Sequence, residues 1–267
     1  MKVYCTLMML FLCGACLAQE TVLPEECASP LKLSLTTDWY PYVHSQSDAP
    51  TSGIDVTLLR RVLSDMGCEL EIIHFPERRT LFELELGAFD VGLGASRVAE
   101  RELLFHYSIP YRQEINRFAF RAEDQDIAAF TRFQQLIEND NVILINLAGW
   151  YGEEIEKAKR EFNGFVFSDT VVKRLKMLSL NRVDAVVDDE LVLCSEIARG
   201  NYKDIRLHPM QLSTADIHFI FNKQSISARF VSVFDRALKE AIESGVKSAL
   251  YARYLKPECS AGTSARE

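Results

Sequence analysis

The sequence predicts an α/β fold in which short apolar strands alternate with amphipathic helices. Apolar residues recur at helical spacing over residues 54–67, and short apolar runs separate this stretch from later helical ones. The chain has 267 residues, of which 48% are hydrophobic and 25% are charged. That is enough apolar material for the core of one large domain or of two smaller ones.

The elements are expected in the following order. A strand is predicted at 31–36, where Leu alternates with polar residues, and a helix at 54–67, where Gly67 supplies a stop. Further strands are predicted at 69–75, 89–93, 142–146, 164–167, 183–187 and 218–221. Further helices are predicted at 80–86, 153–162, 170–180, 190–199 and 226–244. This count favours two α/β lobes of similar build over one continuous sheet.

Residues 1–18 have the pattern of a secretory signal peptide. Lys2 gives a positive start, an apolar stretch runs to Cys16, and small residues precede Gln19 as they do at a cleavage site. The apolar stretch is too short to span a membrane. A buried N-terminal helix and a lipoprotein signal acylated at Cys16 are the alternatives. We therefore expect an exported, periplasmic protein that is either soluble or tethered by lipid.

Cleavage at that point removes three of the seven cysteines and leaves Cys27, Cys68, Cys194 and Cys259. An even number of cysteines in an exported chain permits two disulfides. The net charge changes from −8 to −9 because Lys2 is lost. An acidic chain is a poor partner for the nucleic-acid backbone. No spacing of His, Cys and acidic residues resembles a metal site, so neither a metal nor a cofactor is expected.

A first candidate site follows the predicted strand at 89–93. Gly94 exposes backbone there, Ser96 offers a hydroxyl, and Arg101 offers a guanidinium that can grip a carboxylate with two hydrogen bonds. Ligands of open α/β sheets bind at the carboxyl ends of strands, where these residues stand. The alternative is that Arg101 belongs to a solvated charged face.

A second candidate stands at the end of the predicted strand 183–187. Asp188 and Asp189 follow that strand, and either carboxylate can receive an ammonium group. The alternative is that the two acids and Glu190 cap the next helix and favour its positive end. Adjacent acids do not define the opposed pair that a glycosidase needs.

Two further groups complete the candidates. Gly149, Trp150 and Tyr151 form a turn into a helix whose backbone N–H groups can hold an anion, although the turn lacks the residues of a phosphate-binding loop. Trp39 stands beside a proline among other aromatic residues and is suited either to a ligand-covering wall or to the core.

Several motifs follow one another along the chain in a characteristic order and spacing. They are Thr36-Thr37-Asp38-Trp39-Tyr40-Pro41-Tyr42, Gly53-Ile54-Asp55-Val56, Leu86-Gly87-Ala88-Phe89-Asp90, Glu100-Arg101, Tyr107-Ser108-Ile109-Pro110-Tyr111 and Asn181-Arg182-Val183-Asp184-Ala185-Val186. In this order the motifs resemble family 3 extracellular solute-binding proteins, the periplasmic type that supplies polar amino acids to transporters. The resemblance covers nearly all of residues 29–256.

The resemblance implies a two-lobed periplasmic binding protein fold of type II. Each lobe is then a helix-flanked, mostly parallel sheet, and two strands form the hinge near residues 118–122 and 215–219. Lobe 1 comprises residues 27–119 and 219–258, and lobe 2 comprises residues 124–214. Residues 259–267 are expected to form a flexible tail.

The same resemblance assigns ligand-binding roles. It implies that Arg101 grips an α-carboxylate beside Gly94 and Ser96, that Asp189 receives the α-ammonium, and that Trp39 covers the ligand's side chain. At Gly149 the chain departs from the family, because Trp150 and Tyr151 replace the usual Thr or Ser. Val98 stands where Thr is common. Arg78 and Arg79 add cations that suit an acidic ligand or one that is not an amino acid.

The resemblance also suggests a disulfide pairing. Cys27 and Cys68 precede two strands that are expected to be neighbours, so we predict a bond between them. Cys194 and Cys259 are then the remaining pair.

The function expected from the sequence is non-enzymatic capture of a small polar ligand, an amino acid or related carboxylate, for an ABC permease. Such a protein is expected to work as a monomer that closes about its hinge. One alternative is a ligand-sensing partner of a membrane receptor. Another is an enzyme resembling cyclohexadienyl dehydratases, for which Glu77 or Asp188 is the candidate acid.

Overall fold

A computed structural model describes residues 23–35, 38–46, 48–74, 86–147 and 149–260 of the chain. The strands are β1 (Leu31–Leu35), β2 (His44–Gln46), β3 (Ala49–Ser52), β4 (Leu70–His74), β5 (Val91–Ser96), β6 (Phe105–Tyr107), β7 (Arg112–Arg121), β8 (Ile143–Ile145), β9 (Phe165–Phe167), β10 (Ala185–Asp189), β11 (Ile205–Leu207) and β12 (Ser213–Asn222). The helices are η1 (Glu25–Ala28), α1 (Ile54–Asp65), α3 (Ala99–Glu102), α4 (Gln125–Ala128), α5 (Gln134–Glu138), α6 (Glu153–Glu161), α7 (Val171–Ser179), α8 (Glu190–Arg199), α9 (Ala228–Glu243), α10 (Val246–Tyr254) and α11 (Pro257–Ser260).

The central sheet is mixed and passes through both lobes. Over the described residues its strand order is β4-β1-β5-β12-β7-β10-β8-β9, with β6 paired to β12 and β11 paired to β7. The strands at the two ends pair in parallel, as in β1 with β4 and β8 with β9. The strands in the middle pair antiparallel. The molecule is thus a two-lobed α/β protein whose lobes share one hydrogen-bonded sheet.

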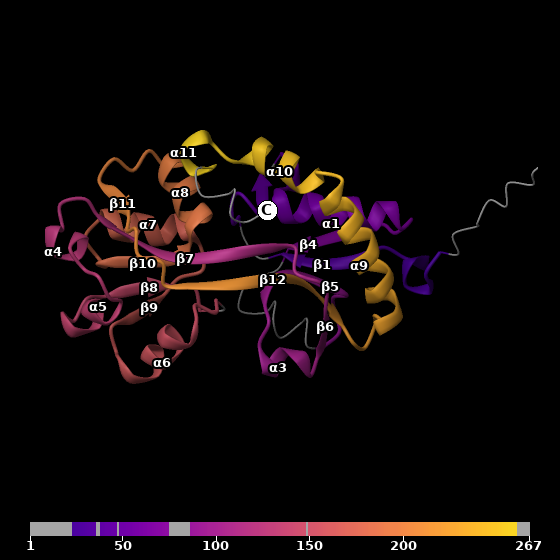
Figure 1. Ribbon diagram of the computed structural model, residues 1–267, viewed down its shortest axis with the longest axis horizontal. Helices are drawn as coiled ribbons and strands as arrows, with labels where there is room; N and C mark the ends of the chain where they lie inside the picture. Colours follow the sequence, from indigo (N-terminus) through magenta and orange to yellow (C-terminus); the bar gives the residue numbers. More distant parts are fainter. Residues whose placement is uncertain (1–22, 36–37, 47, 75–85, 148, 261–267) are drawn as a thin grey trace, which may run out of the picture.

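The two long strands β7 and β12 connect the lobes. They pair with each other over residues 112–116 and 213–217. Beyond this segment β7 pairs with β10 in one lobe, and β12 pairs with β5 in the other. Figure 1 shows them running side by side across the middle of the molecule. Because each of these strands belongs to both lobes, one continuous sheet passes through the molecule. The sequence analysis instead favoured two lobes over one continuous sheet.

Helices cover the sheet within each lobe. In the first lobe α1 packs against α9 and α10, and in the second α7 packs against α8 (Figure 1). The aromatic rings of Phe219 and Phe221 on β12 pack edge-on against Phe234 of α9. In β7 the alternating residues Phe118 and Phe120 belong to a separate core cluster of the second lobe. This alternation follows from the two-residue repeat of a strand, which sends successive side chains to opposite faces.

Most predicted elements are present with small shifts. The helix predicted at 190–199 is α8, and the strand predicted at 183–187 is β10, which continues through Asp189. The strand predicted at 218–221 is the end of the longer β12. Residues 80–85 of the helix predicted at 80–86 lie outside the described residues. The pairing of β7 with β12 falls over residues 112–116, before the crossing expected at 118–122.

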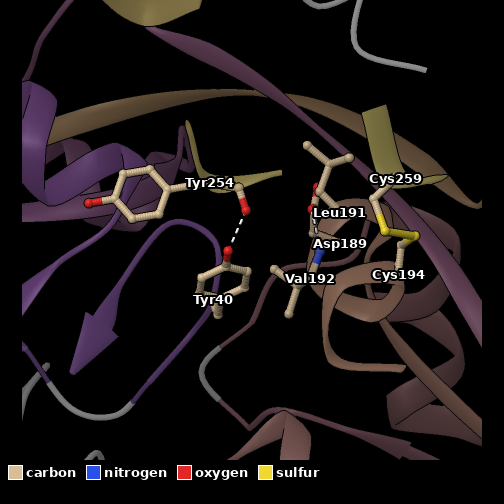
Figure 2. The surroundings of a disulfide bond; sticks show 7 residues. All are labelled: Tyr40, Asp189, Leu191, Val192, Cys194, Tyr254 and Cys259. Carbon is tan, nitrogen blue, oxygen red and sulfur yellow. Dashed lines mark hydrogen bonds between the residues drawn. A yellow bond between two sulfur atoms is a disulfide. The ribbon is translucent and has the colours of Figure 1, made fainter. Parts of the chain in front are cut away.

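Both disulfide pairings are confirmed. Cys27 and Cys68 are bonded, with their Cα atoms 4.8 Å apart, and so are Cys194 and Cys259, at 5.7 Å. The second bond attaches α11 to α8 (Figure 2). Cys259, which was placed at the start of the predicted tail, therefore lies in a bonded helix. Residues 261–267 and the predicted signal peptide lie outside the described residues.

Among the described residues, no helix combines the length and the apolar character that crossing a membrane requires.

Candidate functional site

The strand ends predicted to bind ligand face each other across the two connecting strands. Pairing in the middle of the sheet is antiparallel three times in succession, so β5 and β10 run in opposite directions. Ser96 at the end of β5 is in register with Ile217 and, beyond it, Arg112. Asp189 at the end of β10 is in register with Asn116. Arg112 and Asn116 are four residues apart on β7, so the two strand ends are separated by about 13 Å along the strand direction.

A polar stripe of β7 spans this interval. Arg112, Glu114 and Asn116 alternate along the strand and are all buried. Buried strand positions are ordinarily apolar, and a buried charge is costly unless it is paired. Three such side chains in succession therefore make this stripe a candidate for the binding site. The sequence analysis missed them, because it expected the crossing later, at residues 118–122; the pattern Arg-x-Glu-x-Asn directly before that segment is the signal that indicates them.

Arg112 is a deeply buried cation at one end of this stripe. Its Nε donates to both carboxylate oxygens of Asp55 at 3.2 Å, and its side chain has no exposed surface. Its guanidinium lies 3.7 Å from the ring centroid of Tyr42 and 5.2 Å from that of Trp39. Nη1 and Nη2 have no hydrogen-bond partner. Burial raises the pKa of Asp55, which the positive charge of Arg112 partly offsets.

Glu114 lies beside this guanidinium, with its Oε2 atom 3.6 Å from Arg112 Nη1. Burial raises the pKa of Glu114 to about 8; the positive charge of Arg112 opposes this rise, and the negative charges of Asp189 and Asp188 add to it. The carboxyl group consequently keeps its proton at neutral pH and can donate a hydrogen bond.

Trp39 lies against Gly94. A Cβ at Gly94 would stand 3.2 Å from the indole ring, and the φ of +69° at this position also favours glycine. The indole Nε1–H donates to Asp188 Oδ1 at 3.2 Å. Residues of the first lobe thus contact the end of β10 directly.

Asp189 is fully buried at the end of β10. It accepts hydrogen bonds from the backbone N–H groups of Leu191 and Val192, at 2.8 and 3.2 Å, and so caps α8. It also accepts from the Tyr42 hydroxyl at 3.1 Å and from the Ile115 backbone at 3.3 Å. Asp189 therefore caps α8, as the alternative interpretation of the sequence expected. Its carboxylate also contacts Tyr42 of the first lobe.

Asp188 is paired within the second lobe. Its carboxylate accepts from the guanidinium of Arg174, a side chain that is almost entirely buried. It also accepts from the backbone N–H of Asp189 at 2.8 Å. The Trp39 indole, the Arg174 guanidinium and the Asp189 backbone N–H all donate to this carboxylate, which argues against the role of proton donor considered for it.

The Gly149 turn stands next to this pair. The Tyr151 ring folds back over Gly149, and its hydroxyl accepts from the backbone N–H of Asn146 at 3.0 Å. Burial raises the pKa of Tyr151 well above its usual range, and the negative charge of Asp188 adds to the rise. The backbone N–H groups of Gly149 and Tyr151 donate to Asn146 and to Glu156. Trp150 is half-buried.

The remaining predicted residues follow β5. Ser96 is buried at the strand end. Arg101 is half-buried in α3, the short helix that packs against β6 (Figure 1). Trp39 and Gly94 are brought together, and Trp39 reaches the acid pair of β10. Glu77, Arg78 and Arg79 lie outside the described residues. In the described part of the chain, no three acidic, His or Cys side chains are grouped so as to hold a metal ion.

Solved structures share this architecture. The arginine-, lysine-, histidine-binding protein ArtJ of Geobacillus stearothermophilus matches with a TM-score of 0.71 and 21% identity, over 85% of this chain and 95% of that one. A histidine kinase sensor domain similar to periplasmic binding proteins matches at 0.76 and 16%, over 87% and 100%. The ancestral amino acid-binding protein AncCDT-1, a precursor of cyclohexadienyl dehydratase, matches at 0.71 and 17%, over 85% and 96%. At sequence identities of 16–21%, these similarities show a shared fold.

No curated protein matches the sequence. The model of the bacterial extracellular solute-binding proteins, family 3, matches residues 31–257. This match spans both lobes and the connecting strands, and the chain therefore belongs to family 3 of the bacterial extracellular solute-binding proteins.

Proposed function

We propose that the protein captures a small amino acid or a related carboxylate between its lobes and delivers it to a membrane ABC permease. The observation that carries the proposal is the buried polar stripe of Arg112, Glu114 and Asn116, which lies between the facing ends of β5 and β10. Export to the periplasm and action as a monomer are parts of the same proposal.

In this proposal both lobes contribute to binding. Arg101, Ser96 and Gly94 take the ligand's carboxylate, Asp189 takes its ammonium, and Trp39 covers its side chain. Gly149, Trp150 and Tyr151 border the ligand from the second lobe. Charged groups leave water on binding, so each needs a partner. A hydrogen bond to a charged group contributes about 1.5–3 kcal/mol. Several together support micromolar binding, about −8 kcal/mol.

Mass spectrometry of small molecules released from the purified, denatured protein tests this function. We expect a polar amino acid or carboxylate at close to one molecule per chain. A thermal-shift panel of amino acids and organic acids then identifies ligands that raise Tm. Absence of any bound molecule, together with no shift across the panel, would contradict the proposal.

A second function is favoured by one observation, the raised pKa of Glu114. A carboxyl group with a pKa of about 8 is a proton donor at neutral pH. In a dehydration, Glu114 would protonate a leaving hydroxyl of the bound acid. The C–O bond breaks and water departs, the adjacent C–H bond supplies the electron pair of the new C=C bond, and its proton returns to the Glu114 carboxylate. Incubation of the protein with each ligand from the panel, followed by chromatography, separates the two functions. A binding protein returns the ligand unchanged, and an enzyme converts it over many turnovers.

A further inference from the structure

We propose that Arg112 binds a second carboxylate of the ligand, so that the preferred ligands are small dicarboxylates, acidic amino acids included. This inference rests on the proposed function and names the ligand class of the same site. It gives Arg112 a role separate from that of Arg101, which is assigned the first carboxylate.

The first reason is that Arg112 is incompletely paired. A guanidinium has five N–H donors, and the protein supplies Asp55 as acceptor for Nε. Nη1 and Nη2 are buried without a hydrogen-bond partner. A buried donor left unsatisfied costs about 1–3 kcal/mol. A ligand that supplies acceptors here removes that penalty and thereby gains affinity.

The second reason is the position of these two nitrogens. Nη2 lies 3.8 Å from the place that a Cβ on Gly94 would occupy, and the Trp39 ring borders the same point. Across the sheet, Arg112 is also in register with Ser96 at the end of β5, through Ile217 of β12. The unpaired edge of the guanidinium therefore faces the residues assigned to the ligand. The proposal requires the lobes to separate at Trp39 for a ligand to reach this edge.

The third reason is that the surrounding groups select a carboxylate. The guanidinium of Arg112 itself lies over the Tyr42 ring and near the Trp39 ring, so a cationic ligand side chain would meet an occupied aromatic face and a like charge. Protonated Glu114, 3.6 Å from Nη1, adds a further donor. A carboxylate accepts from all of these donors, whereas the NH2 of a carboxamide would face them as another donor.

The acids nearby do not oppose this arrangement. Asp188 is neutralised by Arg174, and Asp189 stands at the positive end of α8 and accepts two of its backbone N–H groups. Asp55 is held on the far side of the guanidinium through Nε and receives the Tyr111 hydroxyl at 2.6 Å. The incoming carboxylate thus meets hydrogen-bond donors.

Isothermal titration with matched ligand pairs tests the proposal. L-Glutamate, L-aspartate, succinate and glutarate are compared with L-glutamine, L-asparagine and L-lysine. We expect at least one dicarboxylate to bind at least about tenfold more tightly than its amide counterpart, since hydrogen bonds to charged groups are about twice as strong as neutral ones. Arg112→Lys keeps the positive charge but loses the two Nη donor groups, so the preference for a dicarboxylate over its amide should fall about tenfold.

Arg121→Lys is the matched control, because Arg121 is a second buried arginine of β7 and is paired with Asp124 and Asp184. It should leave the preference for dicarboxylates unchanged. If Arg112→Lys does not fold, the double variant Arg112→Gln with Asp55→Asn removes both charges of the pair and should likewise lose the preference.

The outcomes separate the inference from the proposed function. Binding of neutral or basic amino acids without dicarboxylates would overturn the inference and leave the proposed function standing. An unchanged preference in both Arg112 variants would overturn it as well. Absence of binding by every compound, with no molecule released from the purified protein, would instead overturn the proposed function and the inference with it.

Discussion

At the scale of single residues, the site is built from buried polar side chains that the protein only partly pairs. Asp188 and Asp189 have several partners each, whereas two nitrogens of Arg112 have no hydrogen-bond partner. Groups in this condition change protonation or bind ligand more readily than satisfied ones, because both processes relieve a desolvation cost.

Glu114 should make stability depend on pH. Its pKa is about 8 in the folded protein and near 4.5 when exposed, so folding takes up a proton between these values. The resulting stabilisation is full below pH 4.5 and is lost as the pH rises through 8. Glu114→Gln should reduce the fall of unfolding free energy between pH 5 and 8, by up to about 1.4 kcal/mol per pH unit.

Urea unfolding at several pH values measures this slope. Glu123→Gln provides the control, because Glu123 is an exposed acid just beyond the same strand and should leave the slope unchanged. A slope identical to that of the unmodified protein would show that Glu114 is ionised in the folded state.

Arg101 should matter for binding and not for folding. Arg101→Ala is expected to abolish the rise in Tm that ligand produces, because the first carboxylate loses its guanidinium partner. The Tm without ligand should change little, since Arg101 is half-buried in a four-residue helix. Arg97→Ala is the control, because Arg97 is an exposed neighbour paired with Glu102. Equal ligand-induced shifts in the unmodified protein and Arg101→Ala would refute the role of Arg101.

Asp189 combines binding with helix capping, and two substitutions separate these roles. Asn is also a good N-cap, so Asp189→Asn should keep most of the unfolding free energy. The same substitution should weaken the binding of amino acids more than the binding of simple carboxylates. Asp189→Ala should additionally lose about 1 kcal/mol of unfolding free energy. Chemical denaturation and ligand titration of the two variants measure both effects. Unchanged selectivity in Asp189→Asn would contradict a contact with the ammonium.

At the scale of elements, β7 is the segment that sequence patterns describe least well. Its second half carries the alternation expected of a strand, with Phe118 and Phe120 on one face of the sheet. Its first half replaces apolar residues with the polar stripe, so periodicity gives no strand signal over 112–116. By contrast, α8 begins directly after Asp189 and ends at Arg199, as its capping acid and apolar spacing predict.

The segment 38–42 is a second element whose role depends on tertiary contacts. Trp39 and Tyr42 donate to Asp188 and Asp189, and Asp38 pairs with Arg199 at 3.4 Å. Aromatic residues beside a proline are equally common in cores and in binding sites, and here they join one lobe to the other. The sequence identifies Trp39 as a candidate, but its contact with Asp188 requires residues 149 positions apart in the chain to meet.

At the scale of the whole molecule, the lobes are joined by β7, by β12 and by the bond between Cys194 and Cys259. That bond attaches α11, which follows α10 of the first lobe, to α8 of the second (Figure 2). The Tyr40 hydroxyl also donates to the Tyr254 carbonyl close to this point. Cys27–Cys68, in contrast, lies within the first lobe.

The two disulfides should therefore differ in their effect on binding. Replacement of either pair by Ser should lower the unfolding free energy by about 2–4 kcal/mol, the usual contribution of a disulfide. Only Cys194→Ser with Cys259→Ser should also change ligand affinity, because this bond restricts how far the lobes separate. Guanidinium unfolding and titration of both double variants measure this. Equal affinities in the two double variants would contradict a coupling between this bond and lobe movement.

The sequence by itself determined the α/β class, the order of most strands and helices, and the cysteine pairs, because these depend on local periodicity and on a family pattern spread along the chain. It also identified Trp39, Gly94 and Asp189 near the ends of strands. Only the tertiary structure decided that β7 and β12 share one sheet and that Arg112 and Glu114 lie buried between those strand ends. The physical reason is that burial and charge pairing arise between residues far apart in sequence, which no local pattern records.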